Sequence, residues 1–182
     1  LRADVAAAAK RSNNVAHGVV MISSGDNFLA GPEFAVSLQH GVPFYDTVAM
    51  DLIDYDAVGL GNHDFDFGPD VLAQFLAGYT DPPPYYVAAN LDFSGEPTLQ
   101  AFAGTGVIRA NVVLRERGFR IGVIGVITPG LPFSSSPGNV VVGQDLVAPI
   151  MSAVGRMQNR GVNIIILSSH LQDIRNEIEL VG

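Results

Sequence analysis

The sequence predicts an α/β domain, because segments of strand and helix character alternate along its 182 residues. Three apolar runs predict buried strands, at 18–24, 57–60 and 162–167. Each run is closely followed by polar residues, which are Asp26, Asn62 and His170. Open α/β sheets bind ligands beyond the carboxyl ends of their strands, so these three positions are expected to lie in a ligand-binding site.

The other elements follow from spacing and composition. Further strands are expected at 85–89 and in a hairpin formed by 106–114 and 119–127. A run of three prolines at 82–84 predicts a rigid connector, and the Pro-, Ser- and Gly-rich segment 128–139 predicts a loop. No internal repeat or interdomain linker interrupts this order, which fits one domain or most of a larger one. Helices are expected where alanine is abundant or apolar residues recur at helical spacing, at 2–11, 44–55, 69–76 and 147–157.

Composition excludes several classes of function. The net charge is −8 with no block of Lys or Arg, which argues against a partner that is a nucleic-acid polymer. The absence of cysteine excludes disulfides, zinc–cysteine sites and thiol catalysis. The longest charge-free stretch, 121–144, is broken by Gly, Pro and Ser, so no membrane span is expected. The chain begins with Leu1, so we expect it to start after a processing event or a cut.

The polar residues at the strand ends form a set of potential metal ligands. Asp26 offers a carboxylate, Asn62 an amide oxygen and His170 an imidazole, and His63 stands beside Asn62. This mixture of oxygen and nitrogen ligands suits manganese, iron, cobalt or zinc better than copper(I).

Each of these residues also has a purely structural interpretation. An Asp after a strand is often a turn former or a helix N-cap, Gly-Asn is a turn signal, and a lone His is often a hydrogen-bonded loop residue. The other polar residues that could attract attention are expected at the surface or at a solvated helix end: His17, His40, Asp51, Asp54 and Asp56.

Taken together, the clusters are specific. The segments Gly25-Asp26-Asn27, Gly61-Asn62-His63-Asp64-Phe65-Asp66 and Ser169-His170 resemble, in order and spacing, motifs of the calcineurin-like metallophosphoesterases. The 5′-nucleotidase branch is the most similar, through 61–68, 90–95, 121–126 with Thr128-Pro129, and 135–138. The resemblance covers nearly the whole chain. It implies a four-layer α/β/β/α sandwich that carries two divalent metal ions, Mn, Zn, Fe or Co.

The resemblance also implies a role for each residue. Asp26 would bridge both metals, and Asn62 and His170 would bind one of them. Asn62 and His63 would lie beside the phosphate of a small-molecule phosphoester, and Asp66 would orient His63 for catalysis. The nucleophile would be a metal-bound water, because a bound cation strongly lowers the pKa of water.

The chain also departs from the family pattern. No Asp-x-His precedes Asp26, no His-x-His follows His170, and Gln172 stands where the family often has Gly. We therefore expect residues 1–182 to be a metallophosphoesterase catalytic domain truncated at both ends and incomplete, with the C-terminal substrate-binding domain absent. This fragment is expected to be inactive and to bind no metal or a single ion weakly.

The predicted function is hydrolysis of phosphate esters, with nucleotides as the leading substrate class. Alternatives within the family are 2′,3′-cyclic phosphodiesterases, nucleotide-sugar hydrolases and a thiohydrolase, and outside it a non-catalytic binding module. A dinucleotide-binding domain is disfavoured, because 121–125 lacks the Gly-x-Gly-x-x-Gly pattern. The resemblance implies an extracytoplasmic location, which means periplasmic, secreted or surface-attached.

Overall fold

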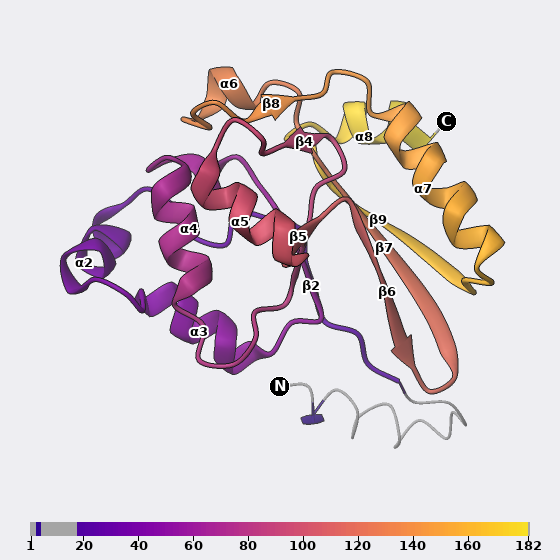
Figure 1. The fold of residues 1–182 in the computed structure, drawn as a ribbon, viewed down its shortest axis with the longest axis horizontal. Coiled ribbons are helices and arrows are strands. Elements are labelled where there is room, and N and C mark those ends of the chain that lie inside the picture. The colour runs from indigo at the N-terminus through magenta and orange to yellow at the C-terminus, as the bar shows by residue number, and fades with distance from the viewer. Residues whose placement is uncertain (1–2, 5–17, 182) are drawn as a thin grey trace.

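The computed structural model describes residues 3–4 and 18–181 (Figure 1). Most of the helix predicted at 2–11, together with His17, lies outside the described residues. One sheet is parallel and has the order β1 (Ile22–Ser23), β2 (Ala57–Gly59), β3 (Tyr85–Val87) and β5 (Ile108–Arg109). A second sheet has the order β6 (Asn111–Glu116), β7 (Phe119–Ile127) and β9 (Ile164–His170).

Helices cover the outer face of each sheet, so the predicted four-layer α/β/β/α arrangement is confirmed (Figure 1). The parallel sheet carries α2 (Pro32–His40), α3 (Tyr45–Ile53), α4 (Pro69–Ala77) and α5 (Pro97–Thr105). The second sheet carries α7 (Val147–Asn159). The remaining elements are short or lie at the edges: the 3₁₀ turn η1 (His63–Phe65), α6 (Leu131–Ser134), α8 (Ile174–Val181), and a small ladder of β4 (Leu91–Asp92) with β8 (Val141–Val142).

The alternation of side chains along the strands produces the layers. Val58 and Tyr86 pair in register and both pack into the large core beneath α2–α5. Their neighbours Ala57 and Val87 face the opposite way, against Val123 of the second sheet. This is the period of two that a strand buried on both faces requires.

The two sheets touch closely at Gly125. A Cβ at this position would lie 2.0 Å from the carbonyl oxygen of Val87, so no side chain fits between β7 and β3. At this close contact, the carbonyl oxygen of Gly125 accepts a hydrogen bond of 2.7 Å from the amide of Ala89. The close contact brings the carboxyl ends of strands from both sheets to a common edge.

Most predicted elements are present, with informative differences. Segment 106–114 was predicted as one strand but forms β5 and β6 in different sheets, because alternation of side chains does not specify sheet membership. Segment 128–139 contains the short helix α6, and the strand predicted at 18–24 pairs only over Ile22–Ser23. Helices α2, α5 and α8 were not predicted, although Pro32 and Pro97 each mark a helix start.

Within the part of the chain that the structure describes, no helix is both long and apolar enough to cross a membrane. Among the polar residues expected at the surface, His40 is exposed. Asp56, in contrast, is not merely solvated, because its carboxylate accepts a hydrogen bond of 2.8 Å from the amide of Met21. This hydrogen bond holds the residue that immediately precedes β1 in place.

Candidate metal centre

The polar clusters at the strand ends come together, although their strands belong to two sheets. β1 and β2 are parallel neighbours, so the loops that follow them leave from the same edge. β9 lies in the other sheet, and its last residue, His170, reaches the first sheet: Nδ1 lies 3.0 Å from the carbonyl oxygen of Ser24. Convergence therefore arises from the packing of two sheets and not from adjacency within one.

Oxygen atoms of Asn62 and Asp26 both lie close to one ring nitrogen of His170. The Nε2 atom of His170 lies 3.1 Å from Oδ1 of Asn62 and 3.3 Å from Oδ1 of Asp26. The carbonyl of Ser24 can only accept a hydrogen bond, so Nδ1 of His170 carries a hydrogen. When Nε2 carries no proton, its lone pair faces the oxygens of Asn62 and Asp26, and a cation bound between these atoms would stabilise the arrangement.

The separations also fit a metal ion. Bonds of roughly 2.0–2.2 Å to nitrogen and oxygen place neighbouring ligands about 3.0–3.4 Å apart at tetrahedral or octahedral angles. Both observed separations from His170 Nε2 fall in that range. Asp26, Asn62 and His170 therefore fit one divalent ion with three protein ligands.

The described residues offer much less to a second ion. Among residues 3–4 and 18–181, no three His, Cys, Asp or Glu side chains gather in a way that could hold a metal. Of the three donors above, only the carboxylate of Asp26 has a second charged oxygen. The donor set in this part of the chain is thus that of one ion, with Asp26 as the residue that could reach another.

Glycines let the loops of Asp26 and Asn62 meet. A Cβ at Gly61 would lie 2.2 Å from Oδ1 and 2.4 Å from the backbone nitrogen of Asp26. Asp26 itself adopts φ 54°, which is uncommon for a residue other than glycine, and its Oδ1 accepts a hydrogen bond of 3.1 Å from the amide of His63. Strained backbone of this kind is typical of functional sites.

A buried carboxylate ties the two loops together. Asp64 is 1% exposed and accepts three N–H hydrogen bonds, of 2.8 and 2.9 Å from Asn27 and of 2.8 Å from the amide of Gly61. Burial raises the pKa of Asp64 to about 7, against the opposing effect of these N–H groups. Asp64 thereby holds the loop of Asp26 against the loop of Asn62.

A second polar chain lies beside the metal donors. Nδ1 of His63 lies 2.6 Å from Oδ2 of Asp66, and Oδ1 of Asp66 accepts a hydrogen bond of 2.9 Å from the hydroxyl of Ser135. The hydrogen bond to Asp66 raises the pKa of His63 above its ordinary value, although partial burial acts in the other direction. The His63 ring remains 41% exposed, so Nε2 is available to a ligand.

Several contacts of the site were not foreseen. The side-chain amide of Gln172 donates a hydrogen bond of 2.7 Å to Oδ1 of Asn62, the same atom that faces His170. Ser135 and Asp64 lie inside motifs that the sequence displays, but no spacing rule reveals that they contact Asp66 and Asn27. The departure at Gln172 was visible in the sequence, whereas its contact with Asn62 required the structure.

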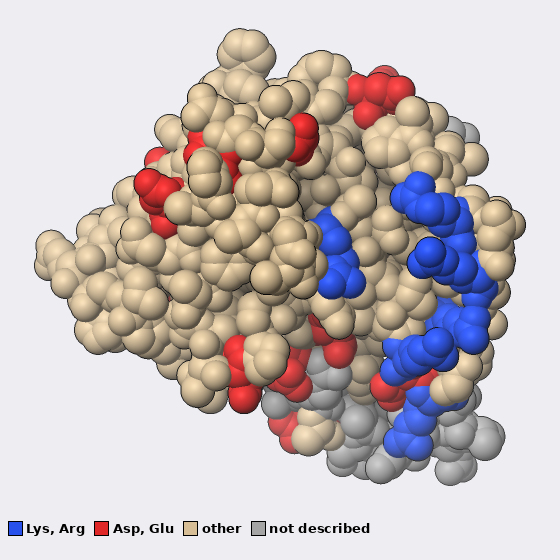
Figure 2. All heavy atoms as spheres, in the orientation of Figure 1, with Lys and Arg blue, Asp and Glu red and all other residues tan. Residues whose placement is uncertain are grey.

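The Arg side chains of β6 and β7 lie away from this edge. Figure 2 shows Lys and Arg side chains gathered along the side formed by β6, β7 and α7, elements that contain Arg115, Arg120 and Arg156. Arg120 pairs with Arg115 near the start of β7, whereas Ile127 at its end pairs with His170. The basic side chains of β6 and β7 thus lie at the opposite end of the sheet from the site.

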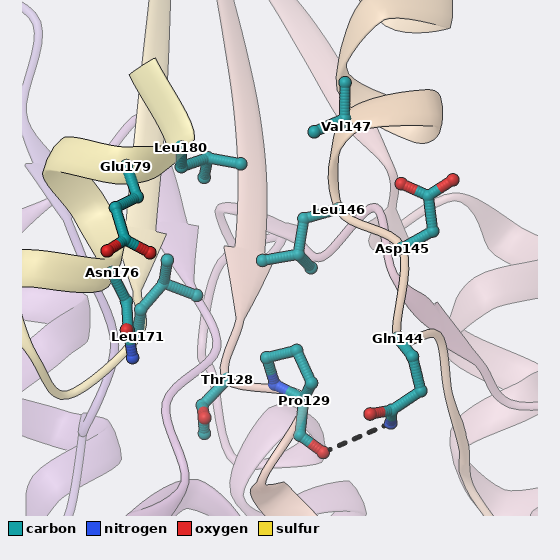
Figure 3. Close-up of a pocket in the computed structure, with 10 residues that line it drawn as sticks. All are labelled: Thr128, Pro129, Gln144, Asp145, Leu146, Val147, Leu171, Asn176, Glu179 and Leu180. Carbon is teal, nitrogen blue, oxygen red and sulfur yellow. Dashed lines mark hydrogen bonds between the residues drawn. The ribbon is translucent and has the colours of Figure 1, made fainter. Parts of the chain in front are cut away.

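A cavity of about 380 Å³ adjoins the site on the α8 side (Figure 3). Leu171 and Thr128 line it, and the amide of Thr128 donates a hydrogen bond of 2.8 Å to the carbonyl of His170. Its other walls come from Gln144 to Val147 and from α8. None of the metal donors lines this cavity.

Comparisons with known proteins agree with this geometry. No protein-family model matches the chain. The chain is 32% identical over 155 residues to Protein 5NUC of Lutzomyia longipalpis, an alignment that covers 84% of this chain and 25% of that protein. It superposes on a 5′-nucleotidase precursor from Thermus thermophilus with a TM-score of 0.74 and 32% identity, over 93% of this chain and 31% of the other.

A further superposition shows the fold alone. The calcineurin-like phosphoesterase YfkN of Bacillus subtilis is 21% identical, with a TM-score of 0.65 over 92% of this chain and 53% of that one. The chain spans about a quarter of the length of the curated relative named above, which has 25% of its length aligned. The sheet order, the converging donors and these similarities together identify the chain as a member of the 5′-nucleotidase family of metallophosphoesterases.

Proposed function

We propose that the protein hydrolyses phosphate esters, with nucleotides as substrates, by the reaction of a 5′-nucleotidase. The observation that carries this proposal is the convergence of Asp26, Asn62 and His170 beside the hydrogen-bonded pair His63–Asp66. The family is metal-dependent, and the proposed cofactors are two divalent ions drawn from Mn, Zn, Fe and Co. When bound, such ions activate water and neutralise phosphate charge.

Metal binding and proton transfer are proposed for different residues of the chain. Asp26, Asn62 and His170 would hold one ion, and the carboxylate of Asp26 has a second oxygen that could serve another. His63 holds its Nδ1–H towards Asp66, so Nε2 is the atom that donates to a phosphoryl oxygen. Because the bond to Asp66 raises the pKa of His63, the ring keeps its proton closer to neutral pH, where it can bind an anion or protonate a leaving group.

We propose that the 182-residue chain on its own binds a single ion weakly and is inactive. Among the described residues, three proposed donors serve one ion, and no group of three His, Cys, Asp or Glu side chains offers a second site. Two-metal hydrolysis would require both ions, so a chain that held only one would lack part of that chemistry. Residues 1–182 are accordingly proposed as part of one catalytic domain.

The substrate is proposed to be a small molecule and not a nucleic-acid polymer, since the net charge is −8 and the described Arg side chains of β6 and β7 lie away from the site. Cyclic nucleotides and nucleotide sugars are the related substrates to be distinguished. An extracytoplasmic location is proposed on the family resemblance, and the Thermus thermophilus relative is described as a precursor.

The test is metal-dependent phosphate release by the full-length protein across nucleoside mono-, di-, 2′,3′-cyclic and sugar-linked phosphates. We expect Mn²⁺-dependent hydrolysis with a preference for the 5′-monophosphates. Preference for a cyclic or sugar-linked substrate would reassign the reaction within the family. Absence of hydrolysis for all of them, with Mn²⁺ bound, would overturn the enzymatic proposal in favour of a binding module.

A further inference from the structure

Gln172 adopts a backbone conformation that is uncommon for its residue type. It lies two residues after His170, in the connection to α8, and has φ 65°. Four non-glycine residues in the described part of the chain have positive φ; one is Asp26, a proposed metal donor, and another is Gln172. This backbone conformation is unfavourable for residues with a side chain, yet the position holds glutamine, which has a long polar side chain. Such conformations cluster at functional sites, which draws attention to the contacts of the Gln172 side chain.

That side chain makes a direct contact with a metal donor. The Nε2 of Gln172 donates to Oδ1 of Asn62 at 2.7 Å, while His170 Nε2 lies 3.1 Å from the same oxygen. Asn62 is 2% exposed, so its amide cannot exchange this partner freely for water. Gln172 is itself exposed, and its hydrogen bond therefore reaches from the surface into the site.

The hydrogen bond decides which end of the Asn62 amide faces the donors. An asparagine amide presents either an acceptor oxygen or a donor NH₂ group, and the two ends have similar size. Towards a neutral His170 and the carboxylate of Asp26, the NH₂ end would be the better hydrogen-bonding partner. Only the oxygen end, however, can bind a metal. Because Gln172 donates to this same oxygen, it opposes the reversed orientation: reversal would place two NH₂ groups against each other unless the Gln172 amide turned over as well.

We propose that Gln172 is a positioning residue for the metal centre, which keeps Oδ1 of Asn62 turned towards the ion. This inference rests on the proposed metal-binding role of Asp26, Asn62 and His170. Partners that orient metal ligands in this way typically contribute about 10–100-fold to metal affinity.

The experiment compares Mn²⁺ binding by wild type, Gln172→Met and Gln172→Gly. Methionine retains the length and the Cβ of glutamine without an N–H donor, and glycine also relieves the positive φ. The matched control is Gln158→Met, at an exposed position on α7. Calorimetric titration with Mn²⁺ gives the affinity. Thermal melts with and without Mn²⁺ separate metal binding from stability, because a merely structural change shifts both melts equally.

We expect both Gln172 variants to bind Mn²⁺ roughly tenfold or more weakly, with a smaller Mn²⁺-induced rise in melting temperature and no such change in Gln158→Met. Equal or tighter binding by either folded Gln172 variant would overturn the inference. If Gln172→Met does not fold, Gln172→Gly carries the test, because its backbone is unstrained. Wild-type protein that binds no Mn²⁺ would instead refute the proposed metal site, and the inference with it.

Discussion

Nε2 of His170 lies 3.1 Å from Oδ1 of Asn62, although the two residues are 108 positions apart and lie at the ends of strands in different sheets. The distance is that of two ligands on one metal ion. It exists because β7 and β3 approach closely at Gly125, which aligns the carboxyl ends of both sheets. The site is therefore formed by the packing of the two sheets. Substitutions in its loops and side chains can test this arrangement.

Gly61→Ala is expected to disrupt the site and destabilise the fold. The new Cβ would lie 2.2 Å from Oδ1 and 2.4 Å from the backbone nitrogen of Asp26, so one loop must move. Overpacking of this kind costs about 1–3 kcal/mol. Denaturant unfolding measures the change in free energy. The matched control is Gly104→Ala on α5, where a Cβ meets nothing within 4 Å, and there we expect a gain of about 0.5–1 kcal/mol. Equal effects at both positions would contradict the close approach at Gly61.

Asp26→Ala and His63→Ala should separate metal binding from catalysis in the full-length protein. Asp26→Ala removes a proposed metal ligand, so both metal content and turnover should fall. His63→Ala leaves the three donors in place, and turnover should fall about 10²–10⁴-fold with little loss of metal. Elemental analysis alongside phosphate release distinguishes the two. Metal loss in the His63 variant alone would reverse the assignment of roles.

The titration of His63 should depend on Asp66. In the metal-free chain we expect the pKa of His63 to lie above its ordinary value, because of the 2.6 Å hydrogen bond to Asp66, and to be lower in Asp66→Asn. NMR of the imidazole protons measures both values. A raised pKa also means that this pair stabilises the fold below the unfolded-state pKa and that the contribution is lost as pH rises through the folded-state pKa. An unchanged pKa in Asp66→Asn would show that Asp66 does not hold His63 in solution.

Ser135→Ala tests whether the loop after β7 supports this pair. The hydroxyl of Ser135 donates to Asp66 at 2.9 Å, from a segment that also carries α6. Losing one hydrogen bond should cost about 0.5–1.5 kcal/mol of stability and reduce turnover of the full-length protein without reducing metal content. Ser135→Thr, which retains the hydroxyl, should restore turnover. If alanine and threonine behave alike, Ser135 has no part in orienting Asp66.

The sequence predicted the fold class and the place of the site for a physical reason. Apolar runs mark buried strands, and the polar residues that follow them must lie at the ends of those strands, so Asp26, Asn62 and His170 were identifiable before any coordinates. The motif Gly-Asn-His-Asp-Phe-Asp placed His63 and Asp66 three residues apart, which is one turn of the 3₁₀ segment that the structure contains.

Other features depend on three-dimensional packing and have no local signal. The assignment of 106–114 to two sheets follows from contacts across the sandwich and not from alternation of side chains. The hydrogen bond from Gln172 to Asn62 joins residues 110 positions apart, and that from Ser135 to Asp66 joins residues 69 apart. These long-range contacts position the site, while the motifs supply its chemistry.

The most direct test of the central claim is Mn²⁺ titration of the 182-residue chain and of its single alanine variants at Asp26, Asn62 and His170. His40→Ala and Asp92→Ala, at exposed positions outside the site, serve as matched controls. We predict one weakly bound Mn²⁺ per chain, lost in each of the three site variants and retained in both controls. Mn²⁺ binding that survives in the Asp26 and His170 variants would contradict the account.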